Sequence, residues 1–161
     1  MKLLNISLLI FLLVATVSTH SLLAAEEQEW HLIYEVDGIN IHRRVMEESN
    51  FLEFKAEGNL QGAISKYLSV LLDIDEHPNW VPRCLEARNI DKINDRENII
   101  YAVFAGVWPV AYRDYAARMS ITSEPDIQKV RVDIERVDLP DALPVSTDRI
   151  HIPYLKSSWI L

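Results

Sequence analysis

The 161-residue sequence is poor in glycine and cysteine. Its four glycines, at positions 38, 58, 62 and 106, are too few and too scattered to form a glycine-rich phosphate loop. The one cysteine, Cys84, excludes an internal disulfide and is expected to be a small buried side chain. The sequence also lacks a Gly-x-Ser-x-Gly elbow, a Cys-x-x-Cys pair and a His-Glu-x-x-His spacing. We therefore predict no catalytic residue, no metal site and no cofactor.

Basic residues are also scarce. The sequence has 16 Lys and Arg against 24 Asp and Glu, which gives a net charge of −8. Lys2 is the only charged residue before Glu26, so the rest of the chain carries 15 basic against 24 acidic residues. This balance argues against nucleic acids and anionic membrane surfaces as partners. With 49% hydrophobic and 25% charged residues, the chain is expected to form one globular domain.

Long apolar runs are missing except near the N-terminus, where residues 3–17 are mostly apolar. Lys2 precedes this run, and a stretch of small and polar residues that ends at Ala24 and Ala25 follows it. This order is typical of a secretory signal peptide, and the run is shorter than the roughly 20 residues of a membrane-spanning helix. We expect residues 1–25 to be a signal peptide that is removed by cleavage near Ala24 or Ala25. The remaining protein is then periplasmic or secreted, without stable membrane insertion.

Two alternating segments follow the predicted signal peptide. Asp37-Gly38 is typical of a two-residue hairpin turn. Residues 39–45 and 51–57 alternate apolar and polar side chains, as half-buried strands do. We predict that these two strands pair antiparallel through a polar turn around residues 48–50. The preceding residues 30–36 fit either a short helix or an entry strand.

The apolar spacing then changes to that of an amphipathic helix. The residues that follow this spacing are Leu60, Ile64, Tyr67, Leu68, Leu71 and Ile74. We predict one long helix over residues 60–74, with Asn59 as its N-cap and with Pro78 and Pro82 ending it.

From Cys84 onward the pattern is again that of strands, over residues 84–91, 99–105, 114–122, 129–135 and 149–155. Sequential hairpins with one helix inserted after the second strand predict an α+β fold, in which a curved antiparallel sheet surrounds the helix. By pattern alone, a solid core is favoured over a ligand cavity between them. The residues expected to face inward from the sheet are Tyr101, Val103, Tyr115, Ala117, Met119, Val132 and Ile134.

Five segments resemble successive signatures of the START (StAR-related lipid-transfer) domain family. They are residues 34–44 (YEVDGINIHRR), 51–57 (FLEFKAE), 73–87 (DIDEHPNWVPRCLEA), 108–114 (WPVAYRD) and 149–159 (RIHIPYLKSSW). The resemblance of each segment alone is weak evidence, but the five segments occur in the same order as in the family. The resemblance implies a START-like helix-grip fold over residues 26–161 and the non-covalent binding, or transfer, of one lipid or other hydrophobic molecule. Family members continue into a C-terminal helix that closes the tunnel, so we expect this domain to be C-terminally truncated, with that lid helix absent.

Two alternatives to a lipid carrier stay open. One is a helix-grip enzyme of the cyclase or hydrolase type, which requires polar groups that converge inside the cavity. The other is a truncated remnant that binds no ligand and acts through protein contacts, and exposed apolar surface would favour it.

The charged residues offer few ligand-binding candidates. Arg113 fits an anionic head group at the cavity mouth, but a role in fixing the adjacent turn is favoured. Arg118 is expected on the outer face beside Asp114, with Met119 on the inward side, which argues against a polar head-group clamp at that position. The acidic cluster at residues 73–77 is interpreted as a solvated helix end. His42 and His151 are interpreted as surface residues.

Overall fold

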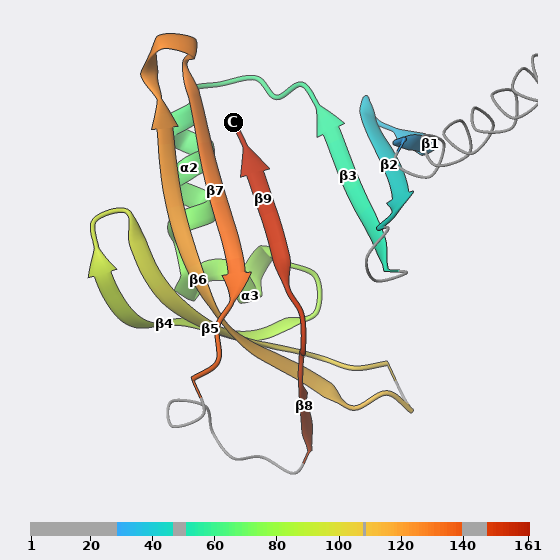
Figure 1. The fold of residues 1–161 in the computed structure, drawn as a ribbon, viewed down its shortest axis with the longest axis vertical. Helices are drawn as coiled ribbons and strands as arrows, with labels where there is room; N and C mark the ends of the chain where they lie inside the picture. Colours follow the sequence, from blue (N-terminus) through green and yellow to red (C-terminus); the bar gives the residue numbers. More distant parts are fainter. Residues whose placement is uncertain (1–28, 47–50, 108, 140–147) are drawn as a thin grey trace, which may run out of the picture. The chain divides into compact units, whose positions relative to one another are not determined.

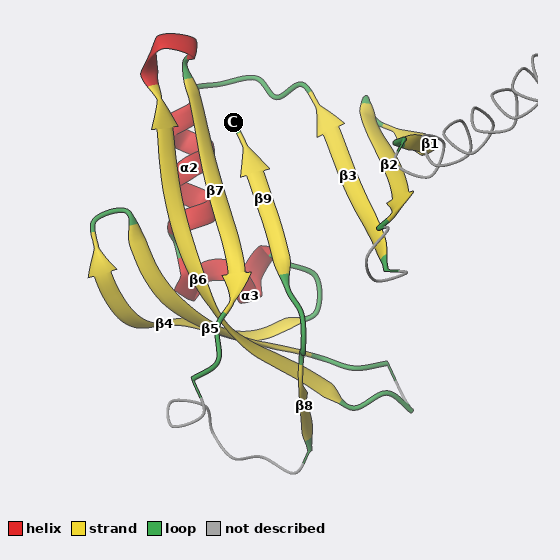
Figure 2. Cartoon of the chain, in the orientation of Figure 1, coloured by secondary structure: helices red, strands yellow, loops and turns green. Residues whose placement is uncertain are grey.

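The computed structural model describes residues 29–46, 51–107, 109–139 and 148–161, and the chain divides into two compact units, residues 1–61 and 62–161. The two units are described separately (Figure 1). The predicted signal peptide, the turn around residues 48–50 and most of the proline-containing loop before residue 148 lie outside the described residues. Strands predominate among the described elements (Figure 2).

The first unit contains a three-stranded antiparallel sheet in the order β1-β2-β3. Its strands are β1 (His31–Val36), β2 (Ile39–Val45) and β3 (Leu52–Gly58). Asp37 and Gly38 have φ values of 50° and 76°, the paired positive angles that a tight hairpin turn needs, and glycine adopts such angles without strain. The predicted hairpin and the predicted pairing of the next two strands are both confirmed. Of the two structures open for residues 30–36, the strand is the observed one.

The helical segment of the second unit is shorter and more broken than predicted. It consists of α2 (Ile64–Leu72), the 3-10 turn η1 (Ile74–Glu76) and α3 (His77–Trp80). Asn59 does not cap α2, because Gly62 has a φ of 140°, outside the helical range, and the N-cap is Ala63. Nor does Pro78 end α2, which stops at Leu72. Pro78 instead lies in the first turn of α3, where its missing N–H costs nothing.

The second unit is built on a sheet with the strand order β4-β5-β6-β7-β9 and with β8 added beside β6. The strands are β4 (Cys84–Asn94), β5 (Glu97–Phe104), β6 (Tyr112–Glu124), β7 (Lys129–Arg136), β8 (Arg149–His151) and β9 (Lys156–Ile160). The single strand predicted over residues 149–155 is wrong. β8 pairs with β6 in parallel, and the chain then continues into β9, which pairs antiparallel with β7.

The core of the second unit lies between α2 and one face of this sheet. Ile74 and the β4 residues Cys84 and Ala87 form one cluster with buried side chains of β5, β6 and β7, against which Leu68 and Leu72 pack. In Figure 1, α2 passes behind β6 and β7. The amphipathic stripe read from the sequence therefore covers a sheet face, as predicted. None of the described helices is both long enough and apolar enough to cross a membrane.

Candidate functional site

The helix-facing side of the six-stranded sheet carries most of the residues predicted to line a ligand site. Ala117 and Met119 are 0% and 1% exposed, and Val132 on β7 is 0% exposed. The register pairs Met119 with Ile134 and Ala102 with Tyr115, which places all of these side chains on the same face. The sequence alternation along β6 and β7 therefore predicted this face correctly.

Tyr101 and Val103 lie on the opposite face, and the prediction that they share the inward face is wrong. The register pairs Tyr101 with Ala116 and Val103 with Asp114, whereas Ile100 lies opposite Ala117. Both faces of β5 are apolar, so alternation gave no signal for choosing between them. The β5 residues that sequence reasoning missed on the helix-facing side are Ile100, Ala102 and Phe104.

The helix-facing side becomes more open toward its margins. Tyr115 and Phe104 are half-buried and stack with ring centroids 5.8 Å apart. At the other margin, Trp159 of β9 lies opposite Val132 and is 44% exposed. An apolar molecule could therefore contact this face at either margin without displacing the buried centre.

Tyr115 and Cys84 supply the polar atoms near the first margin. Burial raises the pKa of Tyr115 to about 12, and the nearby Cys84 adds to this rise. Burial also raises the pKa of the Cys84 thiol, which donates to the Glu86 carbonyl oxygen at 3.4 Å. The raised pKa values favour the neutral forms of both groups. Cys84 is buried, which confirms the expectation that it is a small buried side chain.

Two arginines occur at the ends of the strands on this side of the sheet. Arg113 lies opposite Phe104, and its Nη1 donates to the carbonyl oxygens of Ala111 at 2.9 Å and Tyr112 at 3.5 Å. These bonds hold the backbone of the turn before β6, which is the role that the sequence favoured for Arg113. Arg136 pairs with the carboxylate of Asp138 and lies opposite Ala117 in the register.

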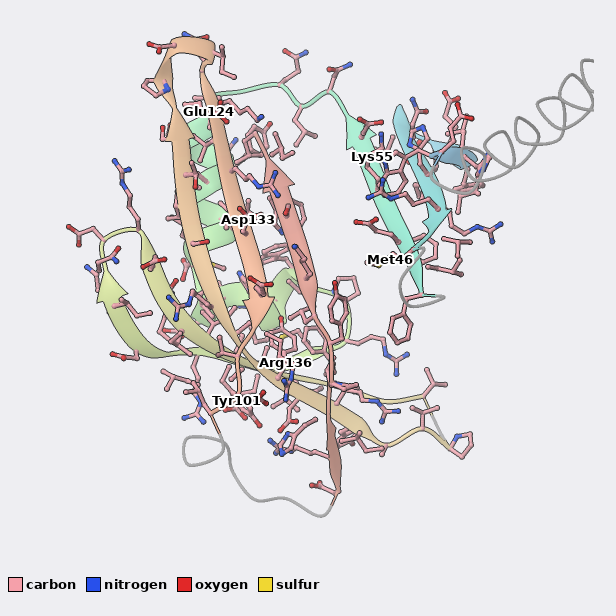
Figure 3. All side chains as sticks on the ribbon, in the orientation of Figure 1. Met46, Lys55, Tyr101, Glu124, Asp133 and Arg136 are labelled. Atoms are coloured by element: carbon pink, nitrogen blue, oxygen red, sulfur yellow. The ribbon has the colours of Figure 1, made fainter. Side chains whose placement is uncertain are left out.

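The opposite face of the sheet holds a polar cluster around Asp114. The Asp114 carboxylate is 0% exposed, and it accepts from the Tyr101 hydroxyl at 2.8 Å. Its other oxygen contacts Nδ1 of His151 at 2.5 Å. Arg149 Nη1 donates to the Tyr101 hydroxyl at 3.0 Å, and the guanidinium of Arg88 lies 5.1 Å from the Tyr101 ring centroid. We name Tyr101, Asp114, Arg149 and His151 the Asp114 cluster; Tyr101 is labelled in Figure 3.

The Asp114 cluster joins β5, β6 and β8. Burial and the hydrogen bond to Asp114 raise the pKa of Tyr101, so its hydroxyl stays a donor. The hydrogen bond to Tyr101 raises the pKa of Arg149. A wholly buried carboxylate is costly unless donors surround it, and here two of the donors come from neighbouring strands. The cluster therefore fastens the short strand β8 to the sheet.

Sequence reasoning missed this cluster. Asp114 does lie on the face opposite Tyr115, as predicted, but that face is buried there and not solvated. His151 is half-exposed, yet its ring reaches the buried carboxylate, so the description of it as a plain surface residue is incomplete. Arg118, further along the same face, is exposed as predicted. Among the described residues, no group of three or more His, Cys, Asp or Glu side chains is arranged to hold a metal ion.

The chain is similar to several known proteins, of which three are described below, although no family model matches the chain. A StAR-related lipid transfer protein from Xanthomonas axonopodis superposes with a TM-score of 0.72 at 29% identity, covering 81% of this chain and 72% of that one. The chain has the START-like helix-grip fold. The lipid transfer and protein localization domain of human StarD13 superposes with the same TM-score at 12% identity, covering 85% and 71% of the two chains, and supports the fold alone.

The third match is to mouse phosphatidylcholine transfer protein, which is 26% identical over 132 residues. The match covers 81% of this chain but spans 61% of the length of that relative. The START-like fold predicted from the five sequence segments is thus confirmed. The ligand-lining roles of Arg113 and of the seven inward candidates stay predictions.

Proposed function

We propose that this protein binds one lipid or other hydrophobic small molecule non-covalently and transfers it, with no covalent chemistry. The observation that carries the proposal is the apolar, helix-covered face around Ala117, Met119 and Val132 in a START-like fold. The similarity to a StAR-related lipid transfer protein and to a phosphatidylcholine transfer protein supports it. Burial of ligand apolar surface would drive binding, at about 25 cal/mol per Å².

Lipid extraction from vesicles tests the proposal. The protein is incubated with vesicles of a mixed lipid extract, separated from them, and its bound lipids are identified by mass spectrometry. We expect about one lipid per chain at saturation. Trp159→Arg places a charge at the open margin of the apolar face, outside the packed core, and should abolish uptake, whereas Arg118→Gln on the opposite face should leave it unchanged. A folded protein that takes up no lipid would reject the proposal.

A helix-grip enzyme is the weaker candidate. The polar groups that converge in the second unit, namely the Asp114 cluster, lie on the face away from α2. On the helix-facing side, the Tyr115 hydroxyl and the Cys84 thiol lie near one margin, and burial raises the pKa of both, which favours their neutral forms. The matched proteins named above are described as lipid-transfer proteins or domains. Turnover of an ester or amide lipid analogue during the extraction assay would favour the enzyme.

The non-binding remnant predicts a different behaviour in solution. It would show no cooperative thermal transition, or it would take up no lipid while binding another protein. A sharp transition together with stoichiometric lipid uptake would exclude it.

We also propose that the protein is exported after removal of residues 1–25. The support is the sequence pattern of a charged start, an apolar run and small residues at Ala24 and Ala25. The intact mass of the secreted protein checks this, since cleavage elsewhere, or retention in the cytoplasm with residues 1–25 intact, contradicts it.

A further inference from the structure

Two arginines at one end of the six-stranded sheet carry positive charges that no acidic side chain offsets. Among the described residues, neither Arg83 nor Arg113 forms an ion pair, whereas five other arginines of the second unit each lie within 4.0 Å of a carboxylate. Asp114 follows Arg113 in the chain, but its carboxylate lies on the other face, where it accepts from Tyr101. Arg113 is half-buried and Arg83 is exposed, so both guanidinium groups can be reached from outside.

The hydrogen bonds of these two guanidinium groups hold them in place and leave most of their donors free. Arg113 uses only Nη1, which donates to the carbonyl oxygens of residues 111–112. Arg83 donates from Nε and Nη2 to the carbonyl oxygens of residues 105–106, at 3.0 Å and 2.6 Å. A guanidinium group has five N–H donors in a planar fork. The edge of Arg113 formed by Nε and Nη2 has no partner among the described residues, and such an edge matches the two oxygens of a carboxylate or phosphate.

Both guanidinium groups lie at the turn between β5 and β6. The backbone is close-packed there, since a side chain at Gly106 would collide with the carbonyl oxygens of Val110 and Ala111. Arg83 binds the carbonyl oxygen of Gly106, and Arg113 binds that of Ala111. Two positive charges are thus placed at one turn, and an anion beside them would lower their mutual repulsion. The net charge of −8 opposes this only weakly, because salt screens distant charges beyond about 8 Å.

The neighbours of Arg113 indicate what kind of molecule would carry the anion. Arg113 lies opposite Phe104, whose ring stacks on Tyr115 at the open margin of the apolar face. Arg83 directly precedes Cys84, which also lies opposite Phe104. An apolar chain on this aromatic margin would therefore end beside the two positive charges. The arrangement fits a molecule with an apolar body and an anionic end.

We infer that the ligand is a lipid with an anionic end, a carboxylate or a phosphate, which binds the free edge of the Arg113 guanidinium group with Arg83 as the second positive group. This inference rests on the proposed function and narrows it to one class of lipid. The turn-fixing bonds of Arg113 are compatible with this role, because they use a different nitrogen and hold the guanidinium group beside the aromatic margin.

Three pyrene-labelled probes with the same ten-carbon chain test the inference by fluorescence titration. They are pyrenyldecanol, pyrenedecanoic acid and pyrenyldecyl phosphate, each used at pH 8 and below the concentration at which it forms micelles. We expect at least one anionic probe to bind about tenfold more tightly than the alcohol, a factor that corresponds to about 1.4 kcal/mol. The tighter of the two tells a carboxylate from a phosphate. Acetate and inorganic phosphate in hundredfold excess should not displace it, because they lack the apolar chain.

Arg113→Gln removes the positive charge and keeps a side chain that can still donate to a carbonyl oxygen. We expect it to abolish the preference for the anionic probe and to leave alcohol binding unchanged, and Arg83→Gln should lower the preference by a smaller factor. Arg96→Gln is the matched control, because Arg96 is exposed, forms no ion pair among the described residues and lies at the other end of β5. It changes the net charge by the same amount and should keep the preference. If Arg113→Gln does not fold, Arg83→Gln decides the test.

Four results would overturn the inference alone. In the first, the alcohol binds as tightly as both anionic probes. In the second, Arg113→Gln and Arg83→Gln leave the preference intact or weaken all three probes equally. In the third, Arg96→Gln lowers the preference as much as Arg113→Gln does, so that net charge explains it. In the fourth, the free anions displace the probe. A folded protein that binds none of the three probes would reject the proposed function together with the inference.

Discussion

The two faces of the six-stranded sheet are stabilised in different ways. The helix-facing side has an apolar centre of packed Ala, Val, Ile and Met side chains against α2. The other side is exposed at Arg118 and toward the far end of β6, but over β5 it is buried, and there the Asp114 carboxylate is wholly enclosed, with donors from β5 and β8. The helix-facing side is thus stabilised by apolar packing, which tolerates substitutions that conserve volume. The other side is stabilised by a few directional hydrogen bonds, which do not tolerate the loss of a partner.

The largest expected effect on the free energy of unfolding comes from a substitution in the Asp114 cluster. Asp114→Ala removes the carboxylate and leaves Tyr101 and His151 without their shared acceptor. Breaking a buried, paired charge costs about 3–5 kcal/mol, so we expect the free energy of unfolding, measured by urea titration, to fall by that amount. Asp126→Ala, in the exposed turn after β6, should change it by less than about 0.5 kcal/mol. Equal small losses in both variants would mean that the Asp114 cluster does not stabilise the fold.

The apolar face should respond somewhat less and in a graded way. Met119→Ala leaves a void beside Ile134, and truncations of this kind cost about 2–5 kcal/mol. Met119→Leu keeps the volume and should cost less than about 1.5 kcal/mol. Calorimetric melting of both variants checks the contrast. If Met119→Leu were as damaging as Met119→Ala, this face would depend on specific geometry as the polar face does.

At the margin of the apolar face, the burial of Tyr115 should make the free energy of unfolding depend on pH in the alkaline range. Because burial raises the pKa of Tyr115 to about 12, from an ordinary value of 10, folding favours the neutral phenol. The stabilising contribution is therefore complete below pH 10 and is lost as the pH rises through 12. By pH 11 we expect wild type to lose about 1.4 kcal/mol relative to Tyr115→Phe. Urea unfolding of both proteins at pH 8 and pH 11 measures the difference, and a difference that does not change with pH would contradict it.

The smallest effect is expected on the solvated part of the polar face. Arg118 lies on the same side of β6 as Asp114, but it is exposed and its Nη1 is 3.9 Å from Glu97 Oε1. Arg118→Gln should change the free energy of unfolding by less than about 0.5 kcal/mol, because exposed ion pairs contribute little. A loss above about 1.5 kcal/mol in thermal or urea unfolding would show that the whole face, and not the Asp114 cluster alone, is stabilised by charge.

Much of this architecture could be read from short-range patterns. The Asp37-Gly38 turn, the alternation along β2, β3 and β7 and the helical spacing within α2 each depend on neighbours a few residues apart. Alternation also placed Tyr115, Ala117 and Met119 on one face correctly. The predicted start of α2 was wrong because a single conformational feature, the positive φ of Gly62, overrides the apolar spacing on either side of it.

The errors in the candidate site have a different cause. In β5 both faces are apolar, so the face that carries Tyr101 could be read only from its pairing with β6. The parallel strand β8, whose His151 lies 37 residues after Asp114 in the chain, contacts the buried Asp114 carboxylate, and no local sequence pattern predicts such a contact. A similar separation hid the role of His151.

The sequence by itself determined the class of fold, because alternating and helical spacings together with five ordered segments resemble the START family, and the superposed structures confirm that fold. It also determined which face of β6 and β7 is apolar. Only the tertiary structure decided which face of β5 joins them, and that the other face encloses a buried carboxylate. The physical reason is range: periodicity reports the side of an element on which a residue lies, whereas burial and hydrogen bonding depend on which distant strand lies beside it.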